Sequence, residues 1–378
     1  MRELDKTMSE LSLFDFLPEE EAARFKPLKS DDWKWTFTDY PKEKNGLKVF
    51  SCFACGGGST MGYKLAGCDV IGCCEIDPKM NEIYVKNHHP KHNFLMDIRD
   101  FNAIPKEELP AELFDLDILD GSPPCTTFSM AGQREDSWGE KKKFREGQKE
   151  QTLDDLSFVF IETVKKLRPK VVIMENVEGL ILGEAFNYVQ QIYKQFHETG
   201  YTVCHWLLKG EQMGVPQRRH RVFFIACRND LKVNPELFNM SFNYEPVTLR
   251  MIRDDKPGHP IDKQSSYYRL LQFAKPHHKS IKDIRLDIGE NSTSGFNDTI
   301  CWPDDVPPTL RATGKTYDAE MKCRFNKVTA CHMQTFPEDY DFCGMVHFYI
   351  LGMSVPPIMT KRIVNRLIEE GVFSYKLD

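Results

Sequence analysis

Residues 47–62 read LKVFSCFACGGGSTMG, an apolar run that leads into a glycine-rich turn and then into a helical pattern. The run is almost continuously apolar, as a strand covered on both faces of a parallel sheet requires. Glycines directly after such a strand let the backbone approach a ligand and aim amide N–H groups at an anion. The stretch therefore predicts a strand, a ligand-binding loop and a helix, in that order.

Four more apolar runs extend this pattern along the chain, and they lie at residues 69–76, 116–120, 170–177 and 221–227. Between them, apolar side chains recur at helical spacing from 153 to 167 and from 186 to 196. Pro169 ends the first of these patterns, and Gly200 follows the second. Strands that alternate with helices in this way predict a doubly wound α/β sheet with parallel strands.

The alternation fades after residue 228, where polar, proline and glycine positions become frequent. We expect a second, smaller and irregular domain at 229–339. Apolar positions between 363 and 368 predict a C-terminal helix that packs back on the first domain. The chain is therefore divided into an N-terminal extension (1–46), a main domain (47–228 plus 340–378) and the second domain.

Composition limits the class of protein. The chain has 378 residues, of which 41% are hydrophobic and 28% charged, as in a soluble globular protein. It contains no membrane-length apolar run, and its first residues lack the apolar stretch of a signal peptide. We therefore expect the twelve cysteines to be reduced thiols.

Charge is unevenly distributed. The net charge is −6, but residues 250–285 carry nine Lys or Arg against four Asp, a local balance of +5, with histidines and aromatic residues between them. Such a segment is compatible with nucleic-acid binding, although basic runs are also common on solvated faces.

Two acidic residues at predicted strand ends indicate a nucleoside-containing cofactor. Glu75 comes seventeen residues after Gly58, where a carboxylate suits a ribose diol, and Asp97 could accept from an adenine amino group. The loop matches neither G-x-G-x-x-G nor G-x-x-x-x-G-K-[ST], which disfavours dinucleotides and phosphoryl transfer. S-adenosylmethionine, whose anionic group is a carboxylate, fits better.

A cysteine follows the predicted strand 116–120 in the stretch Ser122-Pro123-Pro124-Cys125. Amino-group methyltransferases place [DNS]-P-P-[YFW] here, and a nucleophile replaces the aromatic residue in this chain. The exchange makes sense for methylation of carbon, because a thiolate that adds to C6 of cytosine makes C5 nucleophilic. A structural cysteine in a turn is the plain alternative.

The addition needs a proton donor at N3 of the base. Glu175, in the motif ENV, ends the next predicted strand, so its carboxyl group should lie at the same sheet edge. QRRHR (Gln217–Arg221) precedes the run at 221–227, and Arg219 and Arg221 could reach the base O2 and a phosphate.

In order along the chain, these motifs resemble the landmarks of the C5-cytosine-specific DNA methyltransferases. The resemblance covers residues 46–228 and 296–378, and it continues with PPTLRATG (307–314), QTFPEDYDF (334–342) and GMSVPP (352–357). It implies a Rossmann-like methyltransferase sheet, with a target recognition domain in 229–339 and a mobile loop in 126–150 that closes over a flipped base.

The resemblance also implies the roles of individual residues. Cys125 would be the nucleophile and Glu175 the N3 donor, with Arg219 and Arg221 supporting the base and the loop. S-adenosylmethionine would contact the positions Phe53, Gly56, Gly58, Glu75, Ile76, Asp97, Ile98, Ser354 and Val355. The chain departs from the family pattern at Cys55, which stands where a glycine is usual, at Thr126 and at Met353.

The leading hypothesis is a DNA (cytosine-5)-methyltransferase, either part of a restriction–modification pair or an orphan. A tRNA cytosine methyltransferase and an inactive DNA-binding regulator are the alternatives.

The expected partner is double-stranded DNA, with no membrane and no metal, and the protein is expected to be a monomer. We expect it in the cytoplasm, on the bacterial nucleoid or in a phage-infected host. Leu11, Leu13 and Phe14 resemble a peptide that docks on sliding clamps, although a helix packed on the body is the plain alternative.

Overall fold

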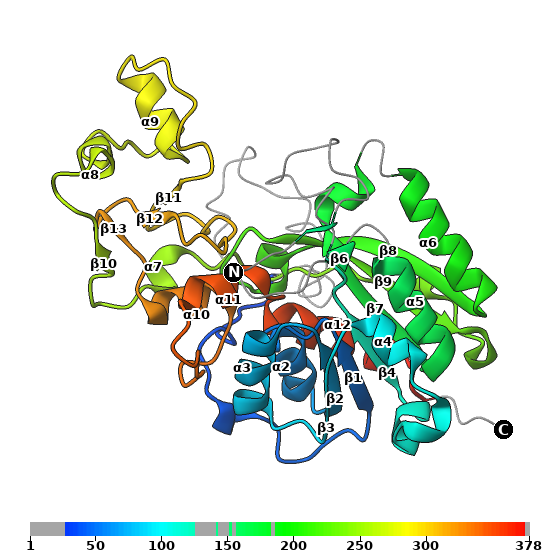
Figure 1. Ribbon diagram of the computed structural model, residues 1–378. Coiled ribbons are helices and arrows are strands. Elements are labelled where there is room, and N and C mark those ends of the chain that lie inside the picture. The colour runs from blue at the N-terminus through cyan, green and yellow to red at the C-terminus, as the bar shows by residue number, and fades with distance from the viewer. Residues whose placement is uncertain (1–26, 125–140, 143–150, 153–155, 183–185, 375–378) are drawn as a thin grey trace, which may run out of the picture.

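The structure, a computed structural model, describes residues 27–124, 141–142, 151–152, 156–182 and 186–374. Figure 1 shows a large twisted sheet with helices on both faces, and a smaller group of strands and short helices beside it. Several predicted features lie outside the described residues, namely Cys125, most of the loop 126–150, and the segment with Leu11, Leu13 and Phe14. None of the helices in the described ranges has the length and apolar character that a bilayer crossing requires.

The large sheet has seven strands in the order β3-β2-β1-β4-β7-β9-β8. Neighbouring strands run parallel except at β9, which is antiparallel to both β7 and β8. The predicted α/β sheet and its five predicted strands are confirmed. The strands are β1 Lys48–Cys52, β2 Asp69–Glu75, β3 His92–Leu95, β4 Ile118–Gly121, β7 Val171–Val177, β8 Tyr201–Lys209 and β9 His220–Arg228.

The direction of β9 corrects the expectation of an all-parallel sheet. A continuous apolar run indicates that a strand is buried on both faces of the sheet. It does not distinguish a parallel from an antiparallel strand. Only residues 210–219 join β8 to β9, and a connection that short, without a crossover helix, favours antiparallel pairing. Six of the nine residues of β8 are only half-buried. Polar residues are therefore tolerated between its apolar ones, and the sequence pattern does not reveal this strand.

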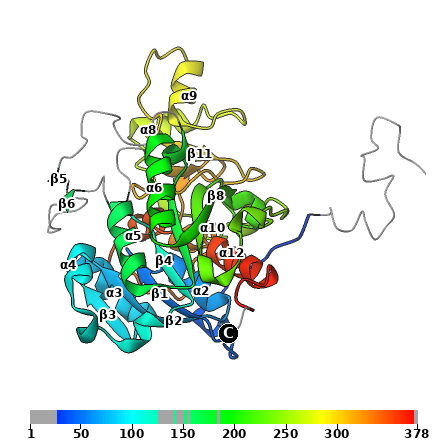
Figure 2. The same cartoon turned by 90° about the vertical axis from the view of Figure 1, so that its right-hand side faces the viewer.

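Helices cover both faces of this sheet. α4, α5 and α6 share one hydrophobic core with strand residues such as Leu119 and Val172, and α2 and α12 share another with Ile118 and Val171. In Figure 2, α5 and α6 lie on the opposite side of the strands from α12. The C-terminal helix therefore packs back on the main domain, as predicted. The helices are α2 Gly58–Leu65, α3 Pro78–His88, α4 Ile98–Ala103, α5 Leu156–Leu167, α6 Phe186–Glu198 and α12 Pro357–Glu369.

The smaller unit has a sheet of four short strands in the order β10-β13-β12-β11. It has its own core, to which Leu270, Ile284 and Tyr317 belong. Its elements are β10 His259–Pro260, α8 Ser266–Leu271, α9 Ile281–Asp287, β11 Thr299–Cys301, β12 Thr316–Asp318 and β13 Cys323–Arg324. A separate two-stranded pair joins β5 Lys141–Lys142 to β6 Gln151–Thr152.

A third core lies between the two units. Residues of α7 Leu249–Ile252, α10 Lys327–Gln334 and α11 His347–Met353 pack there with side chains of α2 and α3. α10 belongs to the predicted second domain, yet it shares this core with the main domain. The limits 229–339 of a target recognition domain therefore stay a prediction.

The described part of the N-terminal extension is packed on the body rather than separate from it. Trp35 is only 6% exposed and belongs to the third core. Its indole Nε1 donates to the carbonyl of Thr335 at 2.9 Å. Nearby, Asp32 pairs with Lys361 at 3.3 Å and with Arg362 on α12. The part of the extension that contains these residues is thus packed on the rest of the protein.

Trp35→Ala tests whether the extension stabilises the fold. Truncation of a buried indole that also donates a hydrogen bond should lower the free energy of unfolding by about 3–5 kcal/mol. Leu237, which is 80% exposed, provides the control. Leu237→Ala should change the free energy of unfolding by less than about 0.5 kcal/mol. Urea unfolding measures both, and equal stability of the two variants would contradict this packing.

Candidate active site

The glycine-rich loop after β1 has an unusual backbone. Phe53, Cys55 and Gly57 have positive φ angles of 56°, 46° and 80°. Gly58 lies so close to the C-terminal part of the chain that a Cβ atom there would be 2.2 Å from the carbonyl oxygen of Val355. The loop thus turns tightly into the N-terminus of α2, where backbone N–H groups are suited to bind an anion.

Cys55 stands where the family pattern has a glycine, and its backbone conformation shows why glycine is usual there. The left-handed φ of this residue is the reason why glycine is usual at the position. The amide N–H of Cys55 donates to Oε2 of Glu75 at 2.8 Å. This bond fixes the loop in the conformation that a glycine would adopt without strain, so the loop keeps its shape in this chain.

Glu75 ends β2 with its carboxylate turned toward the loop. Its side chain is buried, and its other oxygen, Oε1, accepts from the amide of Asp77 at 2.9 Å. Burial raises the pKa of Glu75, whereas these backbone hydrogen bonds oppose the increase. Each carboxylate oxygen can accept more than one hydrogen bond, so Glu75 retains acceptor capacity for ribose hydroxyls.

One hollow in the surface brings four of the predicted cofactor residues together. It is lined by apolar side chains and a single carboxylate, from Phe53, Cys74, Ile76, Met96, Asp97 and Ile98. Asp97 is the N-cap of α4, where its Oδ1 accepts from the amide of Arg99 at 2.8 Å. Apolar walls with one polar acceptor suit a purine ring. The sequence analysis missed Cys74 and Met96, although both directly precede residues that it identified.

Ser354 and Val355 lie against the glycine-rich loop at Gly58, and their contact with S-adenosylmethionine stays a prediction. Ser354 is buried and its Oγ donates to the carbonyl of Ile350 at 2.8 Å. Met353, which departs from the family pattern, is 43% exposed at the end of α11. The backbone of this segment, rather than the Met353 side chain, is therefore in closest contact with the glycine-rich loop.

Glu175 and Arg221 form an ion pair at the carboxyl edge of the sheet. Arg221 Nε lies 2.9 Å from Glu175 Oε1, and the two side chains are 16% and 13% exposed. Nearby, Asn176 Nδ2 donates to the carbonyl of Pro123 at 3.3 Å. The segment that leads to Cys125 is therefore tied to the strand that carries Glu175, and the arginine fixes one carboxyl oxygen of that residue.

Arg219 is placed differently from the expectation. It is 2% exposed, and its guanidinium donates to the carbonyls of Leu310, Gly352 and Ser354 at 3.3, 3.0 and 2.8 Å. Burial lowers its pKa. A guanidinium enclosed by three carbonyls has no access to a base or a phosphate, so this residue anchors the 307–314 and 352–357 segments on β9. The basic pentapeptide alone does not reveal this, because its partners are distant in sequence.

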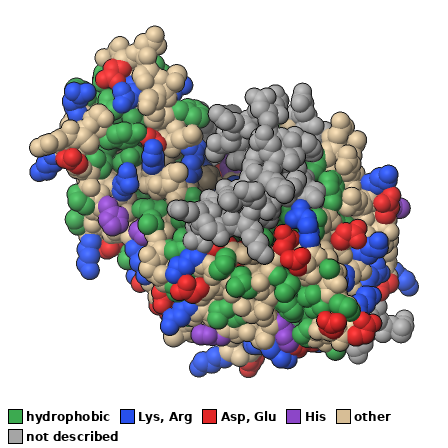
Figure 3. Space-filling model, in the orientation of Figure 1, with side chains coloured by type: hydrophobic (Ala, Val, Ile, Leu, Met, Phe, Trp, Pro, Cys, Tyr) green, Lys and Arg blue, Asp and Glu red, His purple; other side chains and the backbone are tan. Residues whose placement is uncertain are grey.

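Much of the positive charge in 250–285 is neutralised within the smaller unit. Five of its nine cationic residues form ion pairs with acidic side chains, namely Arg250, Arg253, Lys275, Lys279 and Arg285. Figure 3 accordingly shows Lys and Arg mixed with acidic side chains over this unit. The local charge balance in the sequence therefore overstates the charge that a nucleic acid would meet.

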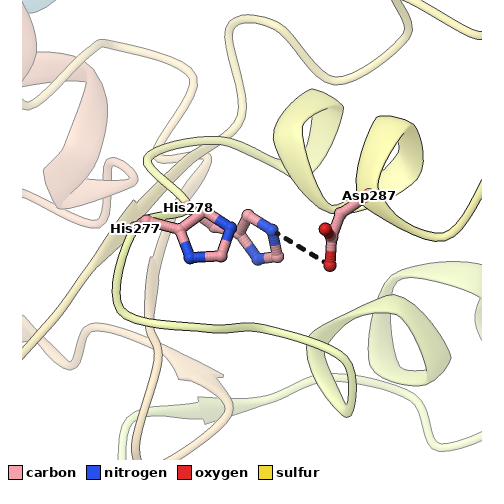
Figure 4. Close-up of side chains that lie close together, drawn as sticks. All are labelled: His277, His278 and Asp287. Carbon is pink, nitrogen blue, oxygen red and sulfur yellow. Dashed lines mark ion pairs between the residues drawn. The ribbon is translucent and has the colours of Figure 1, made fainter.

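The described residues contain one cluster of side chains with metal-ligand chemistry, formed by His277, His278 and Asp287 (Figure 4). Lys275 Nζ lies 2.5 Å from Oδ2 of Asp287, the same oxygen that lies 3.6 Å from His278 Nε2. His278 Nδ1 accepts from the amide of Lys275 at 3.0 Å, which leaves the ring proton on Nε2. A protonated nitrogen and an ammonium group at this position do not fit a metal ion.

His88 and His92 also have partners within the protein. His88 is buried and neutral, because burial lowers its pKa to about 3. Its Nε2 donates to the carbonyl of Gly56 at 3.1 Å. His92 contacts Glu112 instead. Their contacts are thus those of structural residues.

Comparison with known proteins gives a consistent result. The profile of the C-5 cytosine-specific DNA methylases matches residues 47–369. The Type II methyltransferase M.DdeI of Desulfomicrobium norvegicum is 31% identical over 386 aligned positions, which cover 85% of this chain and 88% of that protein. M.FnuDI of Fusobacterium nucleatum is 32% identical over 198 residues, and the match spans about half of each protein, 52% of this chain and 51% of the relative.

Solved structures show the same fold. A DNA modification methyltransferase encoded within an E. coli prophage has a TM-score of 0.60 at 20% identity, over 87% of this chain and 100% of that one. A DNMT2 mutant from Spodoptera frugiperda has a TM-score of 0.58 at 15% identity, over 85% and 100% of the two chains. At these identities the likeness concerns the fold alone.

Gly58→Ala tests the close approach in the loop. The added Cβ must displace the Val355 carbonyl, and we expect about tenfold weaker binding of S-adenosylmethionine, the equivalent of one displaced hydrogen bond. Gly289 is the control, because no atom lies within 4 Å of its would-be Cβ, although its own φ is +84°. Gly289→Ala should therefore leave the affinity unchanged in calorimetry, and a loss of affinity in both variants would refute a local effect.

Proposed function

Because the chain belongs to the family of C-5 cytosine-specific DNA methylases, we propose that it transfers a methyl group from S-adenosylmethionine to C5 of cytosine in double-stranded DNA. The observation that carries this proposal is the ion pair of Glu175 and Arg221, 2.9 Å apart. It lies at the sheet edge to which Asn176 ties the Pro123 segment. Cys125, the proposed nucleophile, follows Pro123 by two residues in the sequence and lies outside the described residues.

The proposed mechanism overcomes the weak nucleophilicity of C5. The Cys125 thiolate adds to C6 of the base, and Glu175 gives a proton to N3, so that C5 becomes part of an enamine. S-adenosylmethionine supplies an electrophilic methyl group for C5. A base then removes the C5 proton, the C5–C6 double bond forms again, Cys125 leaves as thiolate, and N3 returns its proton to Glu175.

Arg221 has a positioning role in this scheme. Its Nε–H is directed at Oε1 of Glu175, and this contact orients the carboxyl group so that the second oxygen can meet N3. A guanidinium suits this purpose because its donors are fixed in one plane. Burial lowers the pKa of Arg221 and the nearby Glu175 carboxyl group opposes that change, so the guanidinium keeps its positive charge.

The hollow beside the glycine-rich loop is the proposed site of the adenosyl group. Phe53 and Ile76 would cover the faces of the adenine, and Asp97 with Ile98 would bind its edge. Glu75 would accept from the ribose hydroxyls, and the backbone at Gly56 and Gly58 would bind the methionine carboxylate at the start of α2.

Double-stranded DNA is the proposed partner, recognised by the smaller unit. Four cationic residues of its 250–285 segment take part in none of its ion pairs, and they could contact phosphates: Lys256, Lys263, Arg269 and Lys282.

We further propose that the protein acts as a monomer in the cytoplasm of a bacterium or a phage-infected host. The alternatives of a tRNA methyltransferase and of an inactive regulator are not favoured, because curated relatives are named Type II methyltransferases and because Glu175 and Cys125 are both present.

A covalent trap tests the mechanism. Bisulfite sequencing of DNA from an expressing host first identifies the methylated sequence, and a duplex with 5-fluorocytosine at that position is then prepared. Fluorine replaces the proton that must be removed from C5, so the last step is blocked. The wild-type enzyme should therefore remain attached to the DNA on a denaturing gel. Peptide mapping should locate the methylated adduct at Cys125, and Cys125→Ser should give none.

Two further variants test the proton donor. Glu175→Gln should form the adduct at least about a hundredfold more slowly, as expected for loss of a general acid. Glu178→Gln changes a carboxyl group three residues further along, which contacts His220 at 3.6 Å, and should react at the wild-type rate. An adduct on another cysteine, or equal rates for both variants, would overturn the assignment.

A further inference from the structure

A buried carboxylate connects two of the elements that form the proposed cofactor site. Asp120, in β4, is 3% exposed. Its Oδ2 accepts from Ser51 Oγ and from Ser59 Oγ, both at 2.7 Å, and its Oδ1 accepts from Tyr63 Oη at 3.0 Å. Three hydroxyl groups therefore point at one carboxyl group, and the mechanism above assigns it no role.

The three hydroxyl partners belong to the elements that form the cofactor site. Ser51 lies two residues before Phe53, at the proposed adenine end, and Ser59 directly follows Gly58, at the proposed carboxylate end. Asp120 itself is five residues before Cys125. The sulfonium of S-adenosylmethionine connects the adenosyl and methionine parts, and Asp120 is bonded to both elements that would hold these two parts.

The charge of Asp120 can change near neutral pH. Burial raises its pKa to about 6, although the hydroxyl groups of Ser51, Ser59 and Tyr63 oppose the increase, and nearby Glu175 adds to it. The other titratable groups that face it are Cys52, Tyr63 and Tyr84, and burial raises the pKa of each, so they stay neutral. Among the described residues, Asp120 has no ion pair with a Lys, Arg or His.

We propose that the ionised Asp120 carboxylate makes the cofactor site prefer cationic S-adenosylmethionine over its neutral product, S-adenosylhomocysteine. The inference rests on the proposed function. Buried charges are screened less than exposed ones, so a negative charge near the site attracts a sulfonium over several ångströms. Methyl transfer converts the sulfonium into a neutral thioether, which removes this attraction and assists release of the product.

The ratio of the two dissociation constants isolates the effect. Both ligands carry the same carboxyl, amino and adenosine groups, so other pH effects largely cancel in the ratio of Kd for the product to Kd for the cofactor. For the full-length wild-type chain, calorimetry should show this ratio rising about fivefold from pH 5 to pH 8, as expected if the pKa of Asp120 is about 6 and falls by about one unit when the cation binds. In Asp120→Asn the ratio should be independent of pH and close to the wild-type value at pH 5.

Asp117→Asn is the matched control. Asp117 is also buried and directly precedes β4, but it accepts from Lys170 Nζ at 2.7 Å and from the amide of Lys48 at 2.8 Å, at the opposite end of the strand. This variant should keep the wild-type dependence of the ratio on pH. Ser51→Ala provides a second variant if Asp120→Asn fails to fold. It removes a bond to the ionised form, so the midpoint of the pH dependence should move to higher pH.

Thermal unfolding separates this role from a purely structural one. Burial raises the pKa of Asp120 from 3.8 to about 6, so its contribution to stability is full below pH 3.8 and is lost as the pH rises through about 6. Asp120→Asn should therefore gain stability relative to wild type between pH 5 and pH 8. If wild type binds both ligands with a constant ratio, or if Asp120→Asn keeps the pH dependence, the inference is wrong. If wild type binds no S-adenosylmethionine, the proposed function is wrong.

Discussion

The close contact between Gly58 and the Val355 carbonyl, in which a Cβ atom would meet the oxygen at 2.2 Å, joins the beginning and the end of the main domain. It brings the N-terminus of α2 next to the segment that leads into α12, and these two helices share one core beneath the sheet. Arg219 secures the same segment from β9 through the carbonyls of Gly352 and Ser354. The shape of the glycine-rich loop, and with it the proposed cofactor site, depends on this contact.

The sequence predicts those features whose cause is local. Five strands were identifiable because each is a continuous apolar run, and the hollow around Phe53 and Asp97 because parallel strands end at the same edge. The direction of β9 depends on the length of a connection, and the burial of Arg219 depends on carbonyls about ninety or more residues away. The hydroxyl partners of Asp120 are also distant in sequence, because Ser51 in β1 and Tyr63 in α2 lie 69 and 57 residues before it. No local pattern contains such information.

The N-terminal segment shows the same difference between local pattern and long-range packing. Phe37 contacts the ring of His88 in an edge arrangement, with centroids 6.2 Å apart, and His88 donates to the Gly56 carbonyl. Residues that precede the family match at 47–369 thus reach the cofactor loop through one neutral histidine. The sequence gives little sign of this, because a mainly polar segment with scattered aromatic residues has no amphipathic period.

The buried polar groups of the sheet edge fall into two classes. Glu75 and Arg219 are bonded mainly to backbone groups, which can change partner only if the chain itself moves. Asp120 and Glu175 are bonded to side chains, whose hydroxyl and guanidinium groups can rotate as a charge appears or disappears. A fixed scaffold with adjustable charges inside it is what the proposed methyl transfer requires, because that reaction would move a proton at the base and remove a positive charge at the cofactor. In this scheme the backbone-bonded groups would define where the ligands lie, and the side-chain-bonded groups would respond to the reaction.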